Sequence, residues 1–151
     1  GHYVVVGLGS FGIRVATLLK DAGCAVAVIE RDESNRYLSE AAQLRIPVIL
    51  GDATQRTTLE AARVGHARAI AVLTEDDMVN IETGLVLREM TGGTGESRTP
   101  IVLRIYDKAV GAAVGRSFRK PGLPRCADGR RHLRHAAIRR CDTWPCRPLP
   151  R

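Results

Sequence analysis

Three glycines at fixed spacing, Gly7, Gly9 and Gly12, form the pattern G-x-G-x-x-G directly after an apolar run at residues 3–6. The first glycine of such a turn permits a backbone bend that side chains disfavour, and the second lets the main chain approach a pyrophosphate. The third lets the following helix pack closely against the strand, and the helix N-terminus attracts phosphates. The spacing therefore predicts a phosphate-binding turn that includes the intervening residues Leu8, Ser10 and Phe11.

An acidic residue, Glu30, follows the next apolar run near the distance from the glycines that dinucleotide-binding sequences show. A carboxylate there offers two acceptor oxygens to two ribose hydroxyls and repels a 2′-phosphate, which favours NAD over NADP. Arg31 weakens this preference, because a guanidinium could bind a 2′-phosphate. We expect Glu30 to contact the ligand; a solvated charge at the end of a strand is the alternative.

Strand-like and helix-like segments alternate five times before residue 116. Continuous apolar runs are typical of strands that are buried on both faces of a parallel sheet, and they lie at residues 3–6, 25–29, 47–50, 69–73 and 101–105. Helical spacing of apolar residues fills the intervals between these runs. The alternation predicts a doubly wound, Rossmann-like α/β sheet of about five parallel strands with right-handed crossovers.

The later helices are preceded by side chains that can accept hydrogen bonds from free backbone N–H groups. They are Asp52 or Thr54 before a short helix, Thr74, Asp76 and Asp77 before a longer one, and Asp107 before the last. Apolar residues at helical spacing predict one face of three helices: Val15, Leu18, Leu19 and Ala22 after the glycine turn, Leu38, Ala41 and Ala42, which we expect to point inward, after Asp32, and Met78, Ile81 and Leu85 after Asp77.

Charge and composition divide the chain near residue 116. Residues 1–115 carry 12 Lys and Arg against 14 Asp and Glu, whereas residues 116–151 carry 11 against 2. The second segment also holds five of the seven prolines and three of the four cysteines. We predict a nucleotide-binding domain at residues 1–116 and a disordered basic tail at residues 117–151, because the tail has too few apolar residues to offset its ordering entropy.

The basic tail has two interpretations. Its arginines could bind nucleic acid, but the mixture of Arg, Pro, Cys, His and Trp resembles a shifted reading frame of GC-rich DNA. We favour the shifted frame and expect no nucleic-acid partner. The cysteines match no zinc pattern, so no metal site is predicted. If neither alternative frame from about codon 116 encodes a sixth strand and a helix, the shifted-frame hypothesis fails.

Nothing in the chain has the length of a membrane-spanning apolar segment, and no signal peptide opens it, so we expect a cytoplasmic protein. The first residue is Gly1 rather than Met, which we interpret as a cut within a longer protein.

The chain resembles the nucleotide-binding domain of potassium-transport regulators, the TrkA-type N-terminal or RCK (regulator of potassium conductance) domain. The resemblance covers roughly residues 3–115, and two of its motifs are not general features of dinucleotide-binding sheets: G-D-A-T after the third strand and T-x-D-D-x-x-N after the fourth. The matching segments are residues 4–12, 28–32, 47–54, 73–80 and 102–105.

The resemblance implies a regulatory protein without catalysis. Members bind NAD⁺ or NADH, or in some cases ATP or ADP, and pass that state to a potassium channel or transporter subunit in the membrane. They form dimers and larger rings, partly through helices beyond the fifth strand. We expect this chain to keep only the first of these helices, from Asp107 on, and therefore to form at most a weak dimer. The site residues that the resemblance implies are Gly7, Gly9 and Gly12 for phosphate, Glu30 for ribose, Asp52 and Ala53 for adenine, Thr74 and Glu75 for the crevice wall, and Arg104 near the phosphates.

Several residues keep a second interpretation. Asp52 could cap the helix that follows it rather than contact adenine. Arg104 interrupts an apolar run, where a charge is costly without a partner, and either a ligand phosphate or a neighbouring carboxylate would serve. The alternative function is the cofactor-binding half of an NAD-dependent dehydrogenase. Against it, we find no substrate domain and no His, Lys or Tyr expected in the crevice to act as acid or base.

Overall fold

The computed structural model describes residues 1–92 and 99–117, and Gly1–Ser117 form one compact unit. The predicted tail lies outside the described residues from 118 onward, so its predicted disorder stays a prediction. Within the described part, no helix combines the length and the apolar character that crossing a membrane requires.

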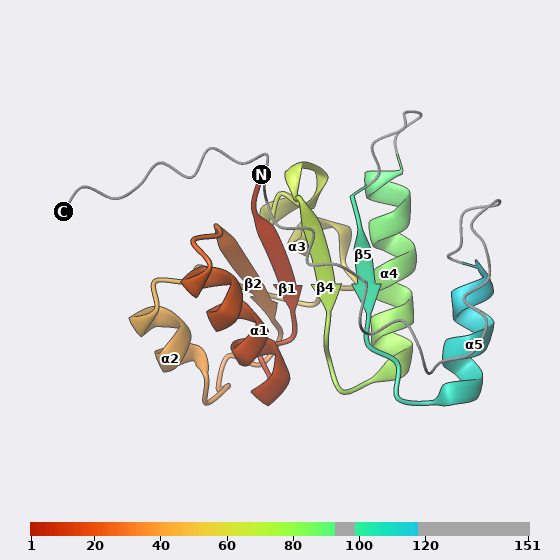
Figure 1. Cartoon of the computed structure of the whole chain (residues 1–151), viewed down its shortest axis with the longest axis horizontal. Helices are drawn as coiled ribbons and strands as arrows, with labels where there is room; N and C mark the ends of the chain where they lie inside the picture. Colours follow the sequence, from red (N-terminus) through yellow and green to blue (C-terminus); the bar gives the residue numbers. More distant parts are fainter. Residues whose placement is uncertain (93–98, 118–151) are drawn as a thin grey trace. The chain divides into compact units, whose positions relative to one another are not determined.

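Five parallel strands form one sheet in the order β3-β2-β1-β4-β5 (Figure 1). The strand order reverses direction between β1 and β4, which makes this pair the switch point of a doubly wound sheet. The predicted Rossmann-like fold is confirmed. The strands are β1 (Tyr3–Val6), β2 (Val26–Glu30), β3 (Val48–Leu50), β4 (Ala69–Val72) and β5 (Ile101–Leu103).

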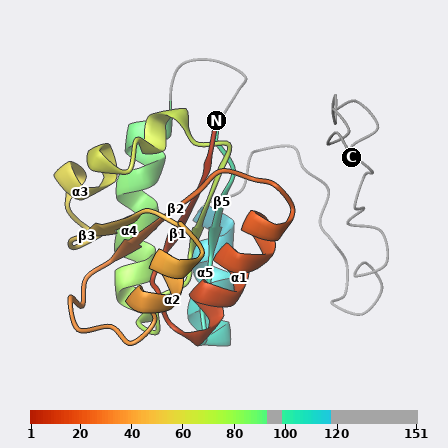
Figure 2. The same cartoon turned by 90° about the vertical axis from the view of Figure 1, so that its left-hand side faces the viewer.

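Helices connect each strand to the next. Helices α1 and α4 lie on opposite sides of the sheet (Figure 2), as right-handed crossovers in both directions from β1 require. The helices are α1 (Ser10–Asp21), α2 (Leu38–Gln43), α3 (Arg56–Ala61), the short 3₁₀ helix η1 (Val64–His66), α4 (Asp77–Thr91) and α5 (Lys108–Ser117).

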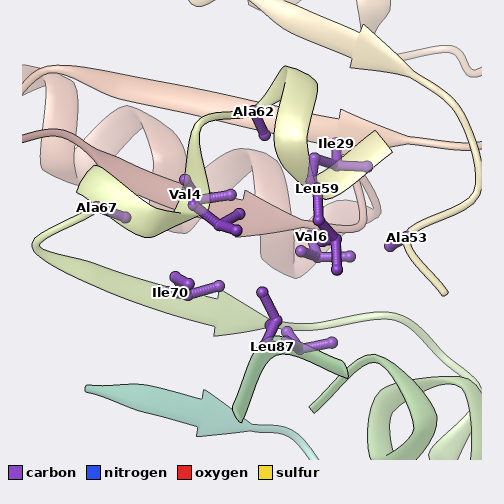
Figure 3. Close-up of a cluster of buried hydrophobic side chains, with 11 residues drawn as sticks. Val4, Val6, Ile29, Ala53, Leu59, Ala62, Ala67, Ile70 and Leu87 are labelled. Carbon is purple, nitrogen blue, oxygen red and sulfur yellow. The ribbon is translucent and has the colours of Figure 1, made fainter. Parts of the chain in front are cut away.

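The central strand β1 is buried on both faces, because successive side chains of a strand point to opposite sides. On one face Val4 and Val6 pack with side chains of α3 and α4, among them Leu59 and Leu87 (Figure 3). On the other face Val5 packs in a second cluster with α1 and α2, whose buried members are Ile13, Ala16 and Ala41. The two apolar layers fix the register of the sheet and the position of every loop at its carboxyl edge.

The apolar residues that were predicted to share one face of α1 are not the ones that the structure buries. The residues that the structure buries are Gly12, Ile13 and Ala16, whereas Leu18 is 69% exposed. Ala22 is also exposed, and Val15 and Leu19 pack only at the margin of their cluster. Apolar residues occur on most of the helix circumference, so periodicity alone could not choose the face. The face of α1 that packs against the sheet is the one with the small residues Gly12 and Ala16, because small side chains allow a close approach.

Of the apolar side chains that were predicted to share one face of α4, Ile81 is half-buried and the other two are exposed. Met78 and Leu85 are 69% and 50% exposed. The buried residues of this helix are instead Asn80, Thr83, Gly84 and Leu87. A Cβ atom at Gly84 would lie 2.7 Å from a methyl carbon of Leu103, so the lack of a side chain there lets α4 pack against β5.

Two helix starts also differ from prediction. Helix α2 begins at Leu38 rather than after Asp32, because the side chains of Asp32 and Asn35 accept hydrogen bonds from backbone N–H groups two residues later and hold turns there. The inward assignment of Ala42 is wrong, since this residue is exposed. Thr54 does not cap α3, whose N-cap is Gln55.

The third glycine of the turn is required by packing. A Cβ atom at residue 12 would lie 1.9 Å from the carbonyl oxygen of Gly7, a distance that no real contact allows. We expect Gly12→Ala to lower the free energy of unfolding by about 1–3 kcal/mol, because α1 must move away from the turn.

Chemical denaturation of the full chain measures this loss, and Gly65→Ala is the matched control. A Cβ atom at Gly65 meets nothing within 4 Å, so this variant should stay within about 0.5 kcal/mol of the parent. Equal stability of Gly12→Ala and the parent would contradict the close approach of α1 to the turn.

Candidate functional site

A cavity of about 390 Å³ lies at the carboxyl ends of the strands, where the loops after β1, β2, β3 and β4 meet. This is the place where ligands bind in open parallel sheets. Ser10, Phe11, Gly12 and Arg104, four of the predicted site residues, are not part of its lining. The other nine line it together: Gly7, Leu8, Gly9, Glu30, Arg31, Asp52, Ala53, Thr74 and Glu75.

The glycine turn forms one wall of the cavity, and its first two glycines differ in what they require. Gly7 has φ +94°, and a Cβ atom there would lie 3.1 Å from the backbone nitrogen of Thr74. The fold itself therefore demands glycine at residue 7. Gly9 has φ −74° and ψ −177°, an extended conformation open to any residue, and a Cβ atom there would meet nothing within 4 Å.

The N-terminus of α1 faces this open space above Gly9. Gly9 is the N-cap of α1, and the helix start has no side-chain capping bond. The first N–H groups of a helix have no partner within the helix, and together with the helix dipole they attract anions. The turn can thus offer donors and space to a phosphate group.

Glu30 holds the glycine turn in place. Its Oε2 accepts a hydrogen bond from Leu8 N–H at 2.7 Å, and its Oε1 accepts bonds from the N–H groups of Arg31 and Asp32, each at 2.8 Å. A carboxylate has about four acceptor positions, so these three bonds leave room for about one more donor. The sequence predicted that both oxygens are available to two ribose hydroxyls, but the fold leaves about one acceptor position of Glu30 free.

Asp52 is held in a turn rather than at a helix cap. Its Oδ1 accepts hydrogen bonds from Thr54 N–H and Thr54 Oγ1–H, each at 2.8 Å. These bonds, with a smaller contribution from the charge of Arg31, hold the pKa of the Asp52 carboxyl below its usual value. Asp52 is consequently ionised at neutral pH. The alternative in which Asp52 caps α3 is wrong, because that helix begins at Arg56.

The loop after β4 is fixed by a buried residue that sequence reasoning did not assign to the site. Asn80 of α4 is fully buried, and its Oδ1 accepts hydrogen bonds from Thr74 N–H at 3.1 Å and Thr74 Oγ1–H at 2.6 Å. Its Nδ2 donates to the carbonyl oxygens of Thr74 and Arg104 at 3.0 and 2.8 Å. The sequence already contained this residue as the last position of the motif T-x-D-D-x-x-N. Its hydrogen bonds give a physical reason for an asparagine at that position.

The two aspartates of the same motif have different partners. Asp76 is the N-cap of α4 and accepts hydrogen bonds from Met78 N–H and Val79 N–H, which confirms its predicted capping role. Asp77 does not cap this helix. Its Oδ1 and Oδ2 accept bonds from Tyr106 N–H and Asp107 N–H at 2.8 and 2.9 Å.

Among the described residues, the Arg104 guanidinium pairs with aromatic rings rather than with a carboxylate, and a ligand phosphate as its partner stays a prediction. β5 ends at Leu103, so Arg104 lies beyond the strand rather than within it. Its guanidinium carbon is 4.9 Å from the centre of the Phe11 ring and 4.3 Å from that of the Tyr106 ring. Two aromatic faces thus stabilise the cation by cation–π attraction.

Among the described residues that line the cavity, acidic side chains outnumber basic ones. Arg31 is the single cationic residue in it, against five acidic residues, Glu30, Asp32, Asp52, Glu75 and Asp76. Such a lining favours ligand groups that donate hydrogen bonds and disfavours dense negative charge away from the N-terminus of α1. Within the described residues, no group of His, Cys, Asp and Glu side chains is arranged to hold a metal ion.

Curated relatives with similar sequences are potassium-uptake proteins. The chain is 41% identical over 81 residues to a Trk system potassium uptake protein TrkA homolog of Pyrococcus horikoshii, covering 53% of this chain and 35% of that protein. It is 34% identical over 107 residues to the TrkA homolog of Pyrococcus abyssi, covering 70% and 44%. The chain thus spans less than half the length of these relatives.

Solved structures with the same fold include parts of a channel protein. The RCK domain of GsuK aligns with a TM-score of 0.62 at 20% identity, covering 78% of this chain and 24% of that one. The GsuK channel bound to NAD gives 0.59 at 20%, covering 78% and 20%. The Kef CTD of Shewanella denitrificans in its AMP-bound form gives 0.59 at 21%, covering 78% and 66%. At these identities the likeness shows the fold alone.

The model of the TrkA-N domain family matches residues 3–116. That range includes the glycine turn, the loops that line the cavity and the Asn80 hydrogen bonds. On this match the chain belongs to the TrkA-N domain family.

Proposed function

We propose that residues 1–116 form a regulatory domain that binds an adenine nucleotide, NAD⁺ or NADH by preference, in the cavity at the carboxyl edge of the sheet. The observation that carries this proposal is Gly9. The fold does not need glycine there, yet the residue leaves open space beside an uncapped helix N-terminus. A ligand that brings a phosphate to the backbone accounts for both features.

The ligand position follows from the chemistry of each loop. The phosphates lie over Gly9 at the start of α1, and a ribose hydroxyl donates to the remaining acceptor position of Glu30. The adenine lies beside Asp52 and Ala53, where the ionised Asp52 can accept a hydrogen bond from an amino group. Thr74 and Glu75 complete the lining beside the glycine turn.

The acidic lining ranks the candidate ligands. A dinucleotide carries its charge on two bridging phosphates, whereas ATP carries more charge at one end and NADP adds a 2′-phosphate near Glu30. We therefore place NAD⁺ and NADH before ADP, and ADP before ATP and NADPH. The NAD-bound GsuK channel and the AMP-bound Kef CTD, which share the fold, support an adenine nucleotide.

The proposed partner is the membrane subunit of a potassium channel or transporter, with the domain on the cytosolic side. The names of the curated relatives as Trk potassium uptake proteins support this assignment. The domain senses the nucleotide and carries out no reaction. No His, Lys or Tyr occurs among the described residues that line the cavity, which argues against the dehydrogenase alternative. Hydride transfer from NADH to any of a panel of small carbonyl compounds would favour that alternative.

Titration calorimetry of the full chain with NAD⁺, NADH, NADPH, ATP and ADP tests the ligand. NAD⁺ or NADH should bind more tightly than ATP and NADPH, because the acidic lining repels the additional phosphate charge. Tighter binding of ATP than of both NAD⁺ and NADH would contradict the ranking, and no binding of any of the five would contradict the proposed function.

Gly9→Val tests the phosphate position. The two methyl groups would occupy the open space over the turn, and we expect nucleotide affinity to fall at least about tenfold, or 1.4 kcal/mol. Stability should change by less than about 0.5 kcal/mol, since a Cβ atom meets no neighbour there. Gly65→Val makes the same change at another unobstructed glycine and should bind NADH as the parent does. Unchanged affinity in a folded Gly9→Val variant would place the phosphates elsewhere.

Glu30→Gln tests ribose recognition while it preserves side-chain size. We expect NADH binding to weaken by about 1–3 kcal/mol, the scale of a lost hydrogen bond to a charged group. NADPH should lose less, because the charge that repels its 2′-phosphate is removed. The ratio of the two affinities does not depend on any loss of folded protein. Glu33→Gln, an exposed acid of the same loop that does not line the cavity, should leave that ratio as it is in the parent.

Assembly is tested by light scattering of the full chain at micromolar concentration. We expect a monomer or a weak dimer, because only the first of the helices through which the family associates, α5, lies in the matched range, residues 3–116. A stable octamer would overturn this expectation.

A further inference from the structure

The start of α5 is held by α4 rather than by the sheet alone. Asp77, in the first turn of α4, accepts the N–H groups of Tyr106 and Asp107 with its two carboxylate oxygens. Asp107 in turn caps α5, because its Oδ1 accepts hydrogen bonds from Ala109 N–H and Val110 N–H at 2.8 and 3.0 Å. One carboxylate of α4 therefore positions the residue that begins α5.

The same helix holds a wall of the cavity. Asn80 lies three residues after Asp77, and its side chain binds the N–H, hydroxyl and carbonyl groups of Thr74 together with the carbonyl oxygen of Arg104. An amide side chain has two donors and two acceptor positions, and all of them are used. Thr74 lines the cavity, whereas Asp77 and Asn80 do not.

Arg104 extends the connection to the glycine turn. Its carbonyl group is bound by Asn80, and its guanidinium lies between the rings of Phe11, in the first turn of α1, and Tyr106, just before α5. We call Thr74, Asp77, Asn80 and Arg104 the clasp. It joins the loops at the carboxyl ends of β1, β4 and β5 through contacts that are all direct.

Apart from the clasp, few contacts hold helix α5 in place. Its side chains at Lys108, Ala109, Ala112 and Ala113 are exposed, and none of the α5 side chains that the structure describes, those of residues 108–115, belongs to either buried apolar cluster. Gly111 and Gly115 further lower its intrinsic helix stability by about 1 kcal/mol each. Elements with few buried contacts open at low free energy, so the order of α5 depends on how firmly its first residues are fixed.

We propose that the clasp couples occupancy of the cavity to the order of α5. A bound nucleotide restrains Thr74, Thr74 restrains Asn80 and the segment after β5, and Asp77 passes this restraint to the cap of α5. The inference rests on the proposed function, since it needs a nucleotide in the cavity. It adds the element of the domain that reports the bound state.

Hydrogen exchange of the full chain, with and without NADH at a concentration that calorimetry shows to be saturating, tests the coupling. In the parent, the backbone amides of residues 109–115 should exchange at least about fivefold more slowly with NADH, the lower end of ordinary coupling between two sites. Asp77→Asn retains one acceptor for two N–H groups, so its α5 should exchange faster and respond to NADH by less than about twofold.

Glu82→Gln is the matched control, because it makes the same change at an exposed position of α4. It should retain the response of the parent. Asp77→Asn should still bind NADH. Because coupling between two sites is reciprocal, its affinity for NADH should fall by no more than the factor by which NADH slows the exchange of α5 in the parent.

The outcomes separate the clasp from the proposed function. NADH binding without any change in the exchange of α5 would overturn the coupling and leave the nucleotide site intact. If NADH slowed the exchange of α5 in Asp77→Asn as much as in the parent, Asp77 would be a purely structural residue, and the proposed coupling would also be overturned. Failure of every tested nucleotide to bind would overturn both.

Discussion

The close contact between the start of α1 and the end of β1 determines the geometry on which the cavity depends. Gly12 lies so near the carbonyl group of Gly7 that no side chain fits between them. The positive φ of Gly7 turns the chain at that point, and Gly7 N–H donates to Ile29 O at 2.8 Å. The N-terminus of α1 is thereby aimed across the ends of the strands. Binding of Leu8 N–H by Glu30 then connects this turn to β2.

The sequence predicted the strands, because their positions follow from short apolar segments of the chain itself. Tyr3–Val6 matched its apolar run in full, and the other strands differ from their runs by one or two residues at an end. Continuous apolar segments define buried parallel strands well, because both faces must be apolar. The inner face of α1 was not predictable in the same way. Leu18 is apolar and exposed, and only the three-dimensional packing of the smaller Ala16 shows why.

For the candidate site, the sequence predicted which loops line the cavity better than it predicted the contacts of individual side chains. Parallel strands bring all their carboxyl ends to one edge, so residues that follow a strand are predicted to lie together. Nine of the thirteen residues that the sequence predicted for the site line one cavity, as this rule requires. The partners of individual side chains do not. The rings around Arg104 come from residues 11 and 106, far apart in the chain, and no spacing rule relates them.

The polar residues of the cavity differ in how much of their hydrogen-bonding capacity the fold already uses. Glu30 has three of about four acceptor positions occupied, and Asp52 has one oxygen occupied twice. Side chains that are fixed in this way lose little conformational entropy when a ligand binds, which makes recognition less costly. The same fixation limits how far these loops can move.

Under the proposed function, a domain whose binding loops move little must report its ligand through an element that is less firmly held. Strands β1 and β4 are excluded, since Val5 and Val72 are completely buried and paired within the sheet. Helices α1, α3 and α4 contribute buried side chains to the two apolar clusters. Of the longer described helices, α5 alone lacks such an anchor, and its first residues are positioned by Asp77 across a chain separation of 29 residues. The acidic residue that fixes α5 therefore lies on the helix whose Asn80 also fixes the cavity wall.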